Sequence, residues 1–172
     1  MKAIPTIYNG IELKSRFEAN VAYLFSQLSL KWQYEPTSFL LPECGLHYMP
    51  DFYLPQVSLW TEVRGYELEG VDLRIVEFAS MIYTGKMGDQ DYLLIKSTDY
   101  GEETPFYENE ERYGVRQSIE VAAAKCSSCG KNYLFGTAGS YACRHCGRAD
   151  GNAHIKELRY LDVSKGQVCL GE

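Results

Sequence analysis

The stretch YMPDFYLPQVSLWTEVRG, residues 48–65, decides the fold, because it predicts two short strands joined by a turn. Large apolar side chains recur at every second position on both sides of the turn, which is the period of a half-buried strand. Pro55 fits a bend, where its missing N–H does least harm. We therefore predict an antiparallel hairpin centred between Gln56 and Val57.

The register of this hairpin brings charged side chains together. Phe52 is expected to face Thr61, and the next pair away from the turn is Asp51 with Glu62. One face is then apolar, and the other gathers these two carboxylates and the cation of Arg64. Opposed acids repel, and a hard divalent cation such as Mg²⁺ offsets that cost. A register shifted by one residue, or a wet face neutralised by Arg64 and solvent, would explain the pattern without a metal.

Two amphipathic helices flank the hairpin. Residues 15–30 carry apolar side chains at helical spacing, and Ser15 is suited to cap the helix. Residues 71–84 repeat this pattern. Residues 91–97 are short, apolar and framed by turn residues, which predicts a buried strand. Residues 115–125 predict a short helix or a strand.

The order of these elements predicts a mixed α/β fold. We place one domain over residues 1–98, an acidic linker over 99–120 and a cysteine-bearing module over 121–152. The linker holds many acids together with glycine and proline, as loops and linkers do. Residues 153–172 form a C-terminal tail to which the sequence assigns no element.

Composition and charge limit the classes of function. A formal net charge of −6 gives no broad attraction for nucleic acid, so any such binding needs a local basic patch. Residues 125–148 provide one, since they contain basic residues and no acid. The N-terminus lacks the pattern of a signal peptide, and no stretch reaches the roughly 20 apolar residues of a membrane span. We expect no membrane association and a cytoplasmic location, the host cytoplasm if the chain is phage-encoded.

Four of the six cysteines form two CxxC pairs: Cys126, Cys129, Cys143 and Cys146. Thiolates in this arrangement predict a closed, structural Zn²⁺ site, that is, a zinc ribbon. The NYLF and SYA segments between the pairs are expected to form a hairpin that brings the pairs together. Redox or disulfide pairing is the alternative, and the absence of an export signal disfavours it. His145 is expected to be exposed, and Cys44 and Cys169 to be free thiols.

The sequence resembles a known family. "PDF" followed by eight residues and "TEVRG" is similar to the signature of PD-(D/E)xK nucleases, which are related to restriction enzymes and resolvases. The upstream segment YNGIELKSRFEANVAYLFSQLSLKWQYEPTSF resembles the leader of small phage-type members. The resemblance covers roughly residues 1–97. It implies a small restriction-endonuclease-like core, in which helices flank a mixed sheet.

The resemblance also assigns roles at the hairpin. It implies that Asp51 and Glu62 bind Mg²⁺ or Mn²⁺ and that the backbone carbonyl of Val63 adds a ligand. Arg64 stands where the family usually has lysine. A guanidinium group stays protonated and cannot act as a general base, but it can orient water or stabilise charge on the scissile phosphate. A lysine elsewhere, Lys86 or Lys96, could compensate.

Two further acids match family positions. Glu18 matches an acid on the first helix that many members place near the metal, and it falls inside the apolar stripe, where a carboxylate needs a partner. Glu18 could instead be an acid in the first turn of the helix, stabilised by the helix dipole or paired to Arg16. Glu35 matches a recurrent position, but it could equally cap the turn before Pro36.

The sequence thus leads to two main hypotheses. The first is a Mg²⁺-dependent DNA endonuclease whose zinc ribbon aids DNA binding and which leaves a 3′-hydroxyl and a 5′-phosphate, as the resemblance implies. The second is a catalytically inactive module of the same fold that binds nucleic acid or protein. A zinc-ribbon regulatory protein is a third reading. Homodimer formation, a protein partner at the ribbon, and RNA in place of DNA stay open.

Overall fold

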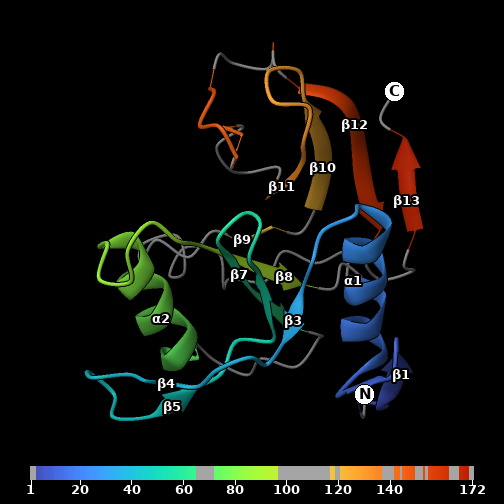
Figure 1. The fold of residues 1–172 in the computed structure, drawn as a ribbon. Coiled ribbons are helices and arrows are strands. Elements are labelled where there is room, and N and C mark those ends of the chain that lie inside the picture. The colour runs from blue at the N-terminus through green and yellow to red at the C-terminus, as the bar shows by residue number, and fades with distance from the viewer. Residues whose placement is uncertain are drawn as a thin grey trace, which may run out of the picture.

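A mixed five-stranded sheet lies at the centre of the computed structural model, with one helix on each face (Figure 1). The strand order is β3-β6-β7-β8-β9. The mixed α/β class predicted from the sequence is therefore confirmed. The structure describes residues 3–64, 72–96, 117–118, 121–136, 142–143, 145–149, 153, 155–162 and 167–170. Apart from residues 117–118, the predicted acidic linker lies outside the described residues.

The predicted hairpin is present with the predicted register. Strand β6 (Phe52–Leu54) runs antiparallel to β7 (Leu59–Arg64), and Phe52 pairs with Thr61. Asp51 immediately precedes this pair, and Glu62 immediately follows it. The two carboxylates therefore lie at the end of the hairpin remote from its turn.

Short strands extend the sheet on both sides. Strand β3 (Gln33–Tyr34) pairs with β6 in antiparallel fashion. On the other side, β7 pairs in parallel with β8 (Asp91–Lys96), after a crossover through α2 (Leu73–Tyr83). This confirms the strand predicted over residues 91–97. Strand β9 (Gln117–Ser118) adds to β8.

Helix α1 (Arg16–Gln27) covers one face of the sheet. Its N-cap is Ser15, as predicted, whose side chain accepts a hydrogen bond from the backbone N–H of Glu18. The apolar stripe of the helix is buried in a core cluster with alternate residues of the hairpin, as the periods of helix and strand require. The members include Val21, Leu24, Phe25, Phe52, Leu54 and Leu59.

The opposite face carries a second core under α2, so the alternative of a wet hairpin face does not hold. Trp60, Tyr92 and Leu94 pack there with Ile75 and Phe78. A central strand with a parallel neighbour is covered on both faces, because the crossover helix returns over the sheet. The charged end of the hairpin is therefore enclosed by protein and not bathed in solvent.

Two small hairpins lie outside this sheet. Strands β1 (Thr6–Tyr8) and β2 (Ile11–Leu13) precede α1 and were not predicted. Their two-residue loop, Asn9 and Gly10, has positive φ at both positions, +49° and +77°, which is the type I′ geometry that Asn-Gly favours. Strands β4 (Phe39–Leu40) and β5 (His47–Tyr48) form an arm beside α2.

A second sheet follows, with the order β11-β10-β12-β13. Residues 115–125 contribute strands and not a helix, since β10 spans Val121–Cys126. The NYLF segment forms β11 (Asn132–Gly136), which pairs with β10. Most of the SYA segment, the other arm of the hairpin expected between the cysteine pairs, lies outside the described residues. The tail supplies β12 (Ile155–Asp162) and β13 (Gln167–Leu170), which had no predicted element.

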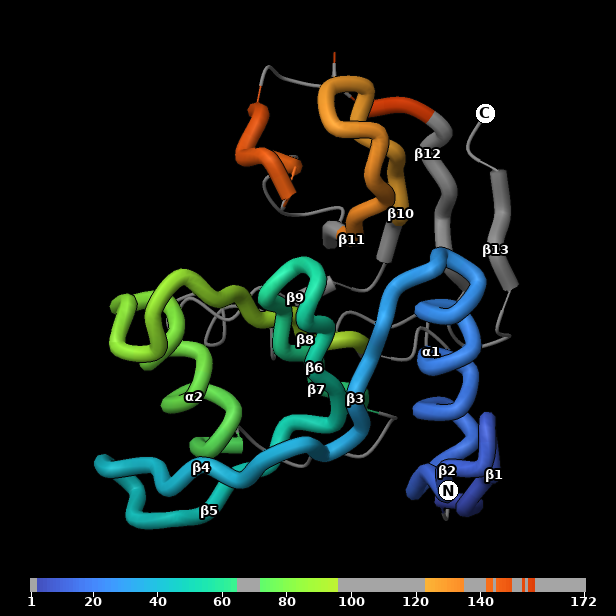
Figure 2. The backbone as a smooth tube through the Cα atoms, viewed as in Figure 1, coloured from blue at the N-terminus to red at the C-terminus, as the bar shows by residue number. Residues whose placement is uncertain are grey.

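The second sheet contacts the first core. Ala123 and Leu134 belong to the same buried cluster as the stripe of α1. The side chain of Asn132 also donates a 3.2 Å hydrogen bond to the carbonyl of Leu28, just after α1 ends. Figure 2 traces the chain from β2 through α1 to β3 and shows β10 and β11 beyond that end of the helix. No helix in the described part of the chain is long and apolar enough to cross a membrane.

Candidate functional site

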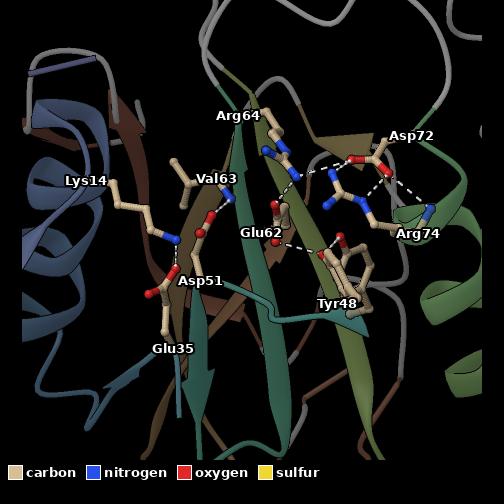
Figure 3. A network of polar contacts seen from close by, with 10 residues as sticks. Lys14, Glu35, Tyr48, Asp51, Glu62, Val63, Arg64, Asp72 and Arg74 are labelled. Carbon is tan, nitrogen blue, oxygen red and sulfur yellow. Dashed lines mark hydrogen bonds and ion pairs between the residues drawn. The ribbon is translucent and has the colours of Figure 1, made fainter. Parts of the chain in front are cut away.

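Two buried carboxylates form the centre of the candidate site. Asp51 is 8% exposed and Glu62 is 2% exposed, at the end of the β6–β7 hairpin. Figure 3 shows both side chains between Lys14 on one side and Arg64 on the other. Buried carboxylates require charged or hydrogen-bonding partners, so the contacts of each acid decide what the site can do.

Asp51 is held by backbone groups. Its Oδ2 accepts a 2.7 Å hydrogen bond from the N–H of Val63, and its own carbonyl accepts one of 2.8 Å from the N–H of Glu35. Burial, followed by the nearby charge of Glu62, raises the pKa of Asp51 to about 8, although the Val63 N–H acts in the opposite direction. In the absence of a cation, this carboxyl therefore holds its proton at neutral pH.

Glu62 uses both of its carboxylate oxygens. Oε1 lies 2.6 Å from Nη2 of Arg64, and Oε2 accepts a 2.7 Å hydrogen bond from the hydroxyl of Tyr48. That hydroxyl is also 3.0 Å from the hydroxyl of Tyr92. Burial raises the pKa of Glu62, and the contacts with Arg64 and Tyr48 only partly oppose it. Burial therefore disfavours the charged form of both acids, and their neighbours offset this effect only in part.

A chain of charged groups fixes Arg64. Its Nη2 lies 3.4 Å from Oδ2 of Asp72, which is the N-cap of α2. The same Asp72 oxygen is 2.8 Å from Nη2 of Arg74. Nε of Arg64 is buried and has no partner among the described atoms. The guanidinium group is therefore oriented by acids on both sides, and one of its N–H donors remains unused.

Two hydroxyl groups hold the carboxylate of Glu18. Its Oε1 accepts a 2.8 Å hydrogen bond from Oγ of Ser15, and Oε2 accepts one of 2.5 Å from the hydroxyl of Tyr34. These partners satisfy the requirement predicted for a carboxylate in the apolar stripe. After burial and the charge of Glu62, the charge of Glu18 also contributes to the raised pKa of Asp51. A catalytic role for Glu18 stays a prediction.

Lys14 and Glu35 form an ion pair at the same end of the hairpin. Glu35, which the sequence analysis left open, is next to Asp51 through its backbone N–H. Lys14 was not predicted. Lys86, one of the suggested substitutes for a lysine at position 64, is exposed, and its positive charge contributes to the lowered pKa of Glu77 on α2. The backbone of Lys96 pairs with Arg64 in the β7–β8 register, and its side chain lies outside the described residues.

The donor set fits a hard divalent cation. Mg²⁺ prefers oxygen ligands, and Asp51, Glu62 and the backbone carbonyl of Val63 are oxygen donors of the kind that it takes. A cation bound there would also reverse the effect of burial on both carboxyl groups. Among the described residues, however, only four cysteines form a group of three or more side chains whose ligand atoms converge. Glu18 therefore does not join the two acids as a third convergent ligand.

The four cysteines predicted as zinc ligands converge in the structure. Sγ of Cys126 lies 3.8 Å from Sγ of Cys146, and Sγ of Cys129 lies 3.7 Å from Sγ of Cys143. Sulfurs at about 2.3 Å from one tetrahedral Zn²⁺ are about 3.8 Å apart, so the spacing matches such a site. The cluster can hold a zinc ion. His145 does not belong to it, and one ring nitrogen lies 2.7 Å from the carbonyl of Asn132.

The two cysteine pairs have the same backbone geometry. The N–H of Gly130 donates a 2.8 Å hydrogen bond to the carbonyl of Cys126, and the N–H of Gly147 does the same to Cys143. Both glycines have positive φ, +71° and +70°, which a side chain rarely permits. The glycine after each CxxC pair therefore closes a turn that directs two sulfurs to one point.

The thiols respond differently to their surroundings. Burial raises the pKa of Cys143 to about 12. Burial acts in the same direction on Cys126, but hydrogen bonds from the backbone N–H groups of Cys129 and Ser128 outweigh it and lower the pKa to about 6. Hydrogen bonds from these backbone N–H groups therefore favour the thiolate form of Cys126. Cys44 is a free thiol, as predicted, while the side chain of Cys169 lies outside the described residues.

Several contacts of the site could not be read from the sequence. Tyr92, which contacts Tyr48, and Lys14, which contacts Glu35, come from elements that are distant along the chain, so no local spacing marks them. Tyr48 is close to Asp51 in the sequence, but its contact with Glu62 depends on how the β4–β5 arm packs. Asp72 carried a usable signal, since aspartate before an apolar helical pattern is a typical N-cap. Its contact with Arg64 could only follow from the crossover.

A scan against models of protein families gives no match, and searches of curated proteins and of solved structures give none either.

Proposed function

We propose that the protein is a metal-dependent endonuclease of the PD-(D/E)xK type that hydrolyses phosphodiester bonds in DNA. The observation that carries this proposal is the buried pair of Asp51 and Glu62 at the end of the hairpin beside Arg64, where burial raises the pKa of both carboxyl groups. Perturbed carboxylates beside arginine are typical of sites that handle phosphate. The resemblance of the surrounding motifs supports the same reading.

The residues of the site have separate roles in this reaction. Asp51 and Glu62 would hold Mg²⁺ or Mn²⁺, with the carbonyl of Val63 as a further ligand. Such an ion, when bound, supplies Lewis-acid polarisation of the scissile phosphate and of water. Tyr48 and the Val63 N–H fix the two carboxylates, which limits their rearrangement as substrate arrives.

Arg64 would stabilise negative charge on the phosphate and would not transfer protons. The oxygen of water bonds to phosphorus as the P–O3′ bond breaks, and the products are a 5′-phosphate and a 3′-hydroxyl. The attacking water loses a proton to solvent, and the leaving O3′ takes one up. Because a guanidinium group cannot accept the proton, Arg64 would stabilise the charge on the phosphate through its N–H donors.

The zinc ribbon would add affinity for DNA. Lys131 and Arg148 are exposed on it, and Lys125 is half-buried, while Arg144 lies outside the described residues. Cations on one small module suit contacts with the phosphate backbone, which provide affinity without sequence readout. A protein partner at the ribbon and a homodimer that cuts both strands are further proposals.

The alternative is a non-catalytic module that binds nucleic acid or protein. The 2.6 Å ion pair between Arg64 and Glu62 favours it, because an arginine can neutralise an acid permanently where a metal once bound. The two functions differ in whether Asp51 is needed for bond cleavage or only for folding.

Incubation of purified protein with plasmid, linear, single-stranded and branched DNA, each with Mg²⁺ or Mn²⁺, separates these functions. Wild-type protein is expected to cut, and Asp51→Asn to lose cutting. The matched control is Asp89→Asn, which makes the same change at an exposed position beyond α2. DNA binding without cleavage by the wild type, retained in Asp51→Asn, would establish the module instead.

A further inference from the structure

Lys14 is anchored at the site through its backbone. It stands directly before Ser15, the N-cap of α1. Its N–H lies 3.1 Å from Oε2 of Glu18 and 3.2 Å from the hydroxyl of Tyr34, so it is shared between two acceptors. The side chain is 64% exposed, yet its ammonium group contacts the carboxylate of Glu35. The root of the side chain is therefore fixed, and its charged end can reach a ligand.

Glu35 has an unusual backbone conformation. Its φ is +43°, in the left-handed region that residues with a side chain rarely adopt. Its N–H donates a 2.8 Å hydrogen bond to the carbonyl of Asp51, and its side chain is 17% exposed. Backbone strain of this kind persists only where the surrounding structure imposes it, and it concentrates at functional sites. Here it places a carboxylate, and with it the ammonium group of Lys14, beside Asp51.

The two cations of the site lie on opposite sides of the acids. Figure 3 shows the ammonium group of Lys14 directed toward Glu35 and Asp51 from the side of α1, while Arg64 approaches Glu62 from the side of α2. The hydrogen bond to Glu35 raises the pKa of Lys14, and the charges of Asp51 and Glu18 add to this effect, so the group is a cation at neutral pH. A bound anion between the two sides would meet positive charge from both.

We propose that Lys14 is a substrate-binding residue, whose ammonium group contacts a phosphate oxygen of the DNA backbone beside Asp51. This inference rests on the proposed function for its substrate. Arg64 already forms ion pairs with two acids, Glu62 and Asp72. Lys14 forms an ion pair with one acid, Glu35, and the side chain of Lys14 is exposed. When a phosphate arrives, Lys14 exchanges its carboxylate partner for a phosphate oxygen. An ordinary surface ion pair would explain the contact but not the strained backbone that supports it.

The test is the salt dependence of DNA binding, measured by fluorescence anisotropy in Ca²⁺, with the recovered DNA checked to be intact. Each lost phosphate contact reduces the slope of log K against log[salt] by about 0.9 on duplex DNA. Lys14→Met is expected to lose one such contact and to bind about tenfold more weakly, whereas Lys14→Arg keeps the wild-type slope. Lys31→Met is the matched control, because Lys31 is also exposed and its backbone bonds to Gln56 at the opposite end of the hairpin.

Glu35→Gln tests the direction of the change in DNA affinity. It releases Lys14 from its acidic partner, so DNA binding should become tighter if the lysine serves a phosphate. If the pair is only structural, Lys14→Met and Glu35→Gln both lower the thermal unfolding temperature and leave the salt slope unchanged, which overturns the inference.

Cleavage by the wild type separates this inference from the proposed function. If the wild type cuts DNA and Lys14→Met has the slope of Lys31→Met, the function stands and the role of Lys14 is wrong. If the wild type binds DNA without cutting, the nuclease proposal fails, and the slope still decides whether Lys14 contacts phosphate. If the wild type does not bind DNA, both are wrong.

Discussion

The hydroxyl of Tyr48 donates a 2.7 Å hydrogen bond to Oε2 of Glu62 inside the core, and this contact joins the β4–β5 arm to the acidic end of β7. Because the bond lowers the pKa of Glu62 against the effect of burial, its loss should favour the protonated acid.

Tyr48→Phe is therefore expected to weaken the binding of Mg²⁺ at pH 7 by roughly 10- to 100-fold, as the loss of a group that orients a metal ligand commonly does. The free energy of unfolding should fall by about 1–3 kcal/mol, since a buried acceptor loses its donor. Calorimetric titration with Mn²⁺ measures the first effect and denaturant unfolding the second. Tyr92→Phe is the control, because it keeps the bond from Tyr48 to Glu62. Equal metal affinity in all three proteins would contradict the role given to Tyr48.

Metal-free protein should lose stability as the pH rises. Asp51 has a pKa of about 8 in the folded chain, against an ordinary value of 3.8. Between these values the folded chain keeps a proton that the unfolded chain has released. The free energy of unfolding then falls with rising pH across this window, by up to about 1.4 kcal/mol per pH unit. Asp51→Asn should flatten this dependence, as measured by urea unfolding at several pH values.

Addition of Mg²⁺ should have the opposite dependence on pH. The ion competes with the proton on Asp51, so the increase in unfolding temperature should be larger at pH 8 than at pH 6. Differential scanning fluorimetry with and without Mg²⁺ measures this difference. An increase that is independent of pH, or that persists in Asp51→Asn, would show that the ion binds elsewhere.

Removal of the charge at position 64 should affect turnover more than substrate affinity. Arg64→Met is expected to lower kcat by roughly 10²- to 10³-fold. This is the usual effect of removing one hydrogen-bond donor that stabilises the charge developing in the transition state. Arg64→Lys keeps a cation but loses the planar group that contacts both Glu62 and Asp72, so it should retain part of the activity. Arg16→Met, at an exposed position on α1, should match the wild type. Unchanged kcat in Arg64→Met would remove this residue from the mechanism.

The cysteine cluster should bind one zinc ion per chain and stabilise more than the ribbon. Cys143→Ser is expected to lose the metal and to lower the unfolding temperature of the α1 core, because Ala123 and Leu134 pack into that core. Elemental analysis gives the zinc content, and near-ultraviolet circular dichroism follows the packing around Trp32, which contacts the same cluster. Cys44→Ser should keep the zinc. A Cys143→Ser protein with an unchanged thermal transition would show that the two parts are energetically independent.

Local patterns predicted the elements that local forces determine. The alternation in residues 48–65 and the cap at Ser15 gave the hairpin register and the start of α1, since both depend on neighbouring residues. The Asn9–Gly10 loop offered an equally local signal for β1–β2, which the sequence interpretation missed. The cysteine pairs specified their cluster because metal geometry restricts spacing.

The remaining parts of the site depend on long-range packing. Burial of Asp51 and Glu62 follows from α2 returning over β7, which strand periodicity alone cannot reveal. The partner strand of the NYLF segment, β10, ends at the first cysteine, so the spacing within the cysteine pairs did not point to it. Lys14 reaches Glu35 only because β3 adds to β6.

The shared core between α1 and the second sheet also restricts the order of events during synthesis. Among the residues whose side chains are described, the buried cluster runs from Leu13 to Leu134. A ribosome delivers the chain from its N-terminus, so α1 and the acidic hairpin emerge long before the residues that close their core. The last members arrive in the same segment as the first cysteine pair. For a nascent chain, the residues that close the core and the first two of the four cysteines therefore emerge together, so packing over the acidic hairpin and assembly of the cysteine cluster belong to the same late stage of synthesis.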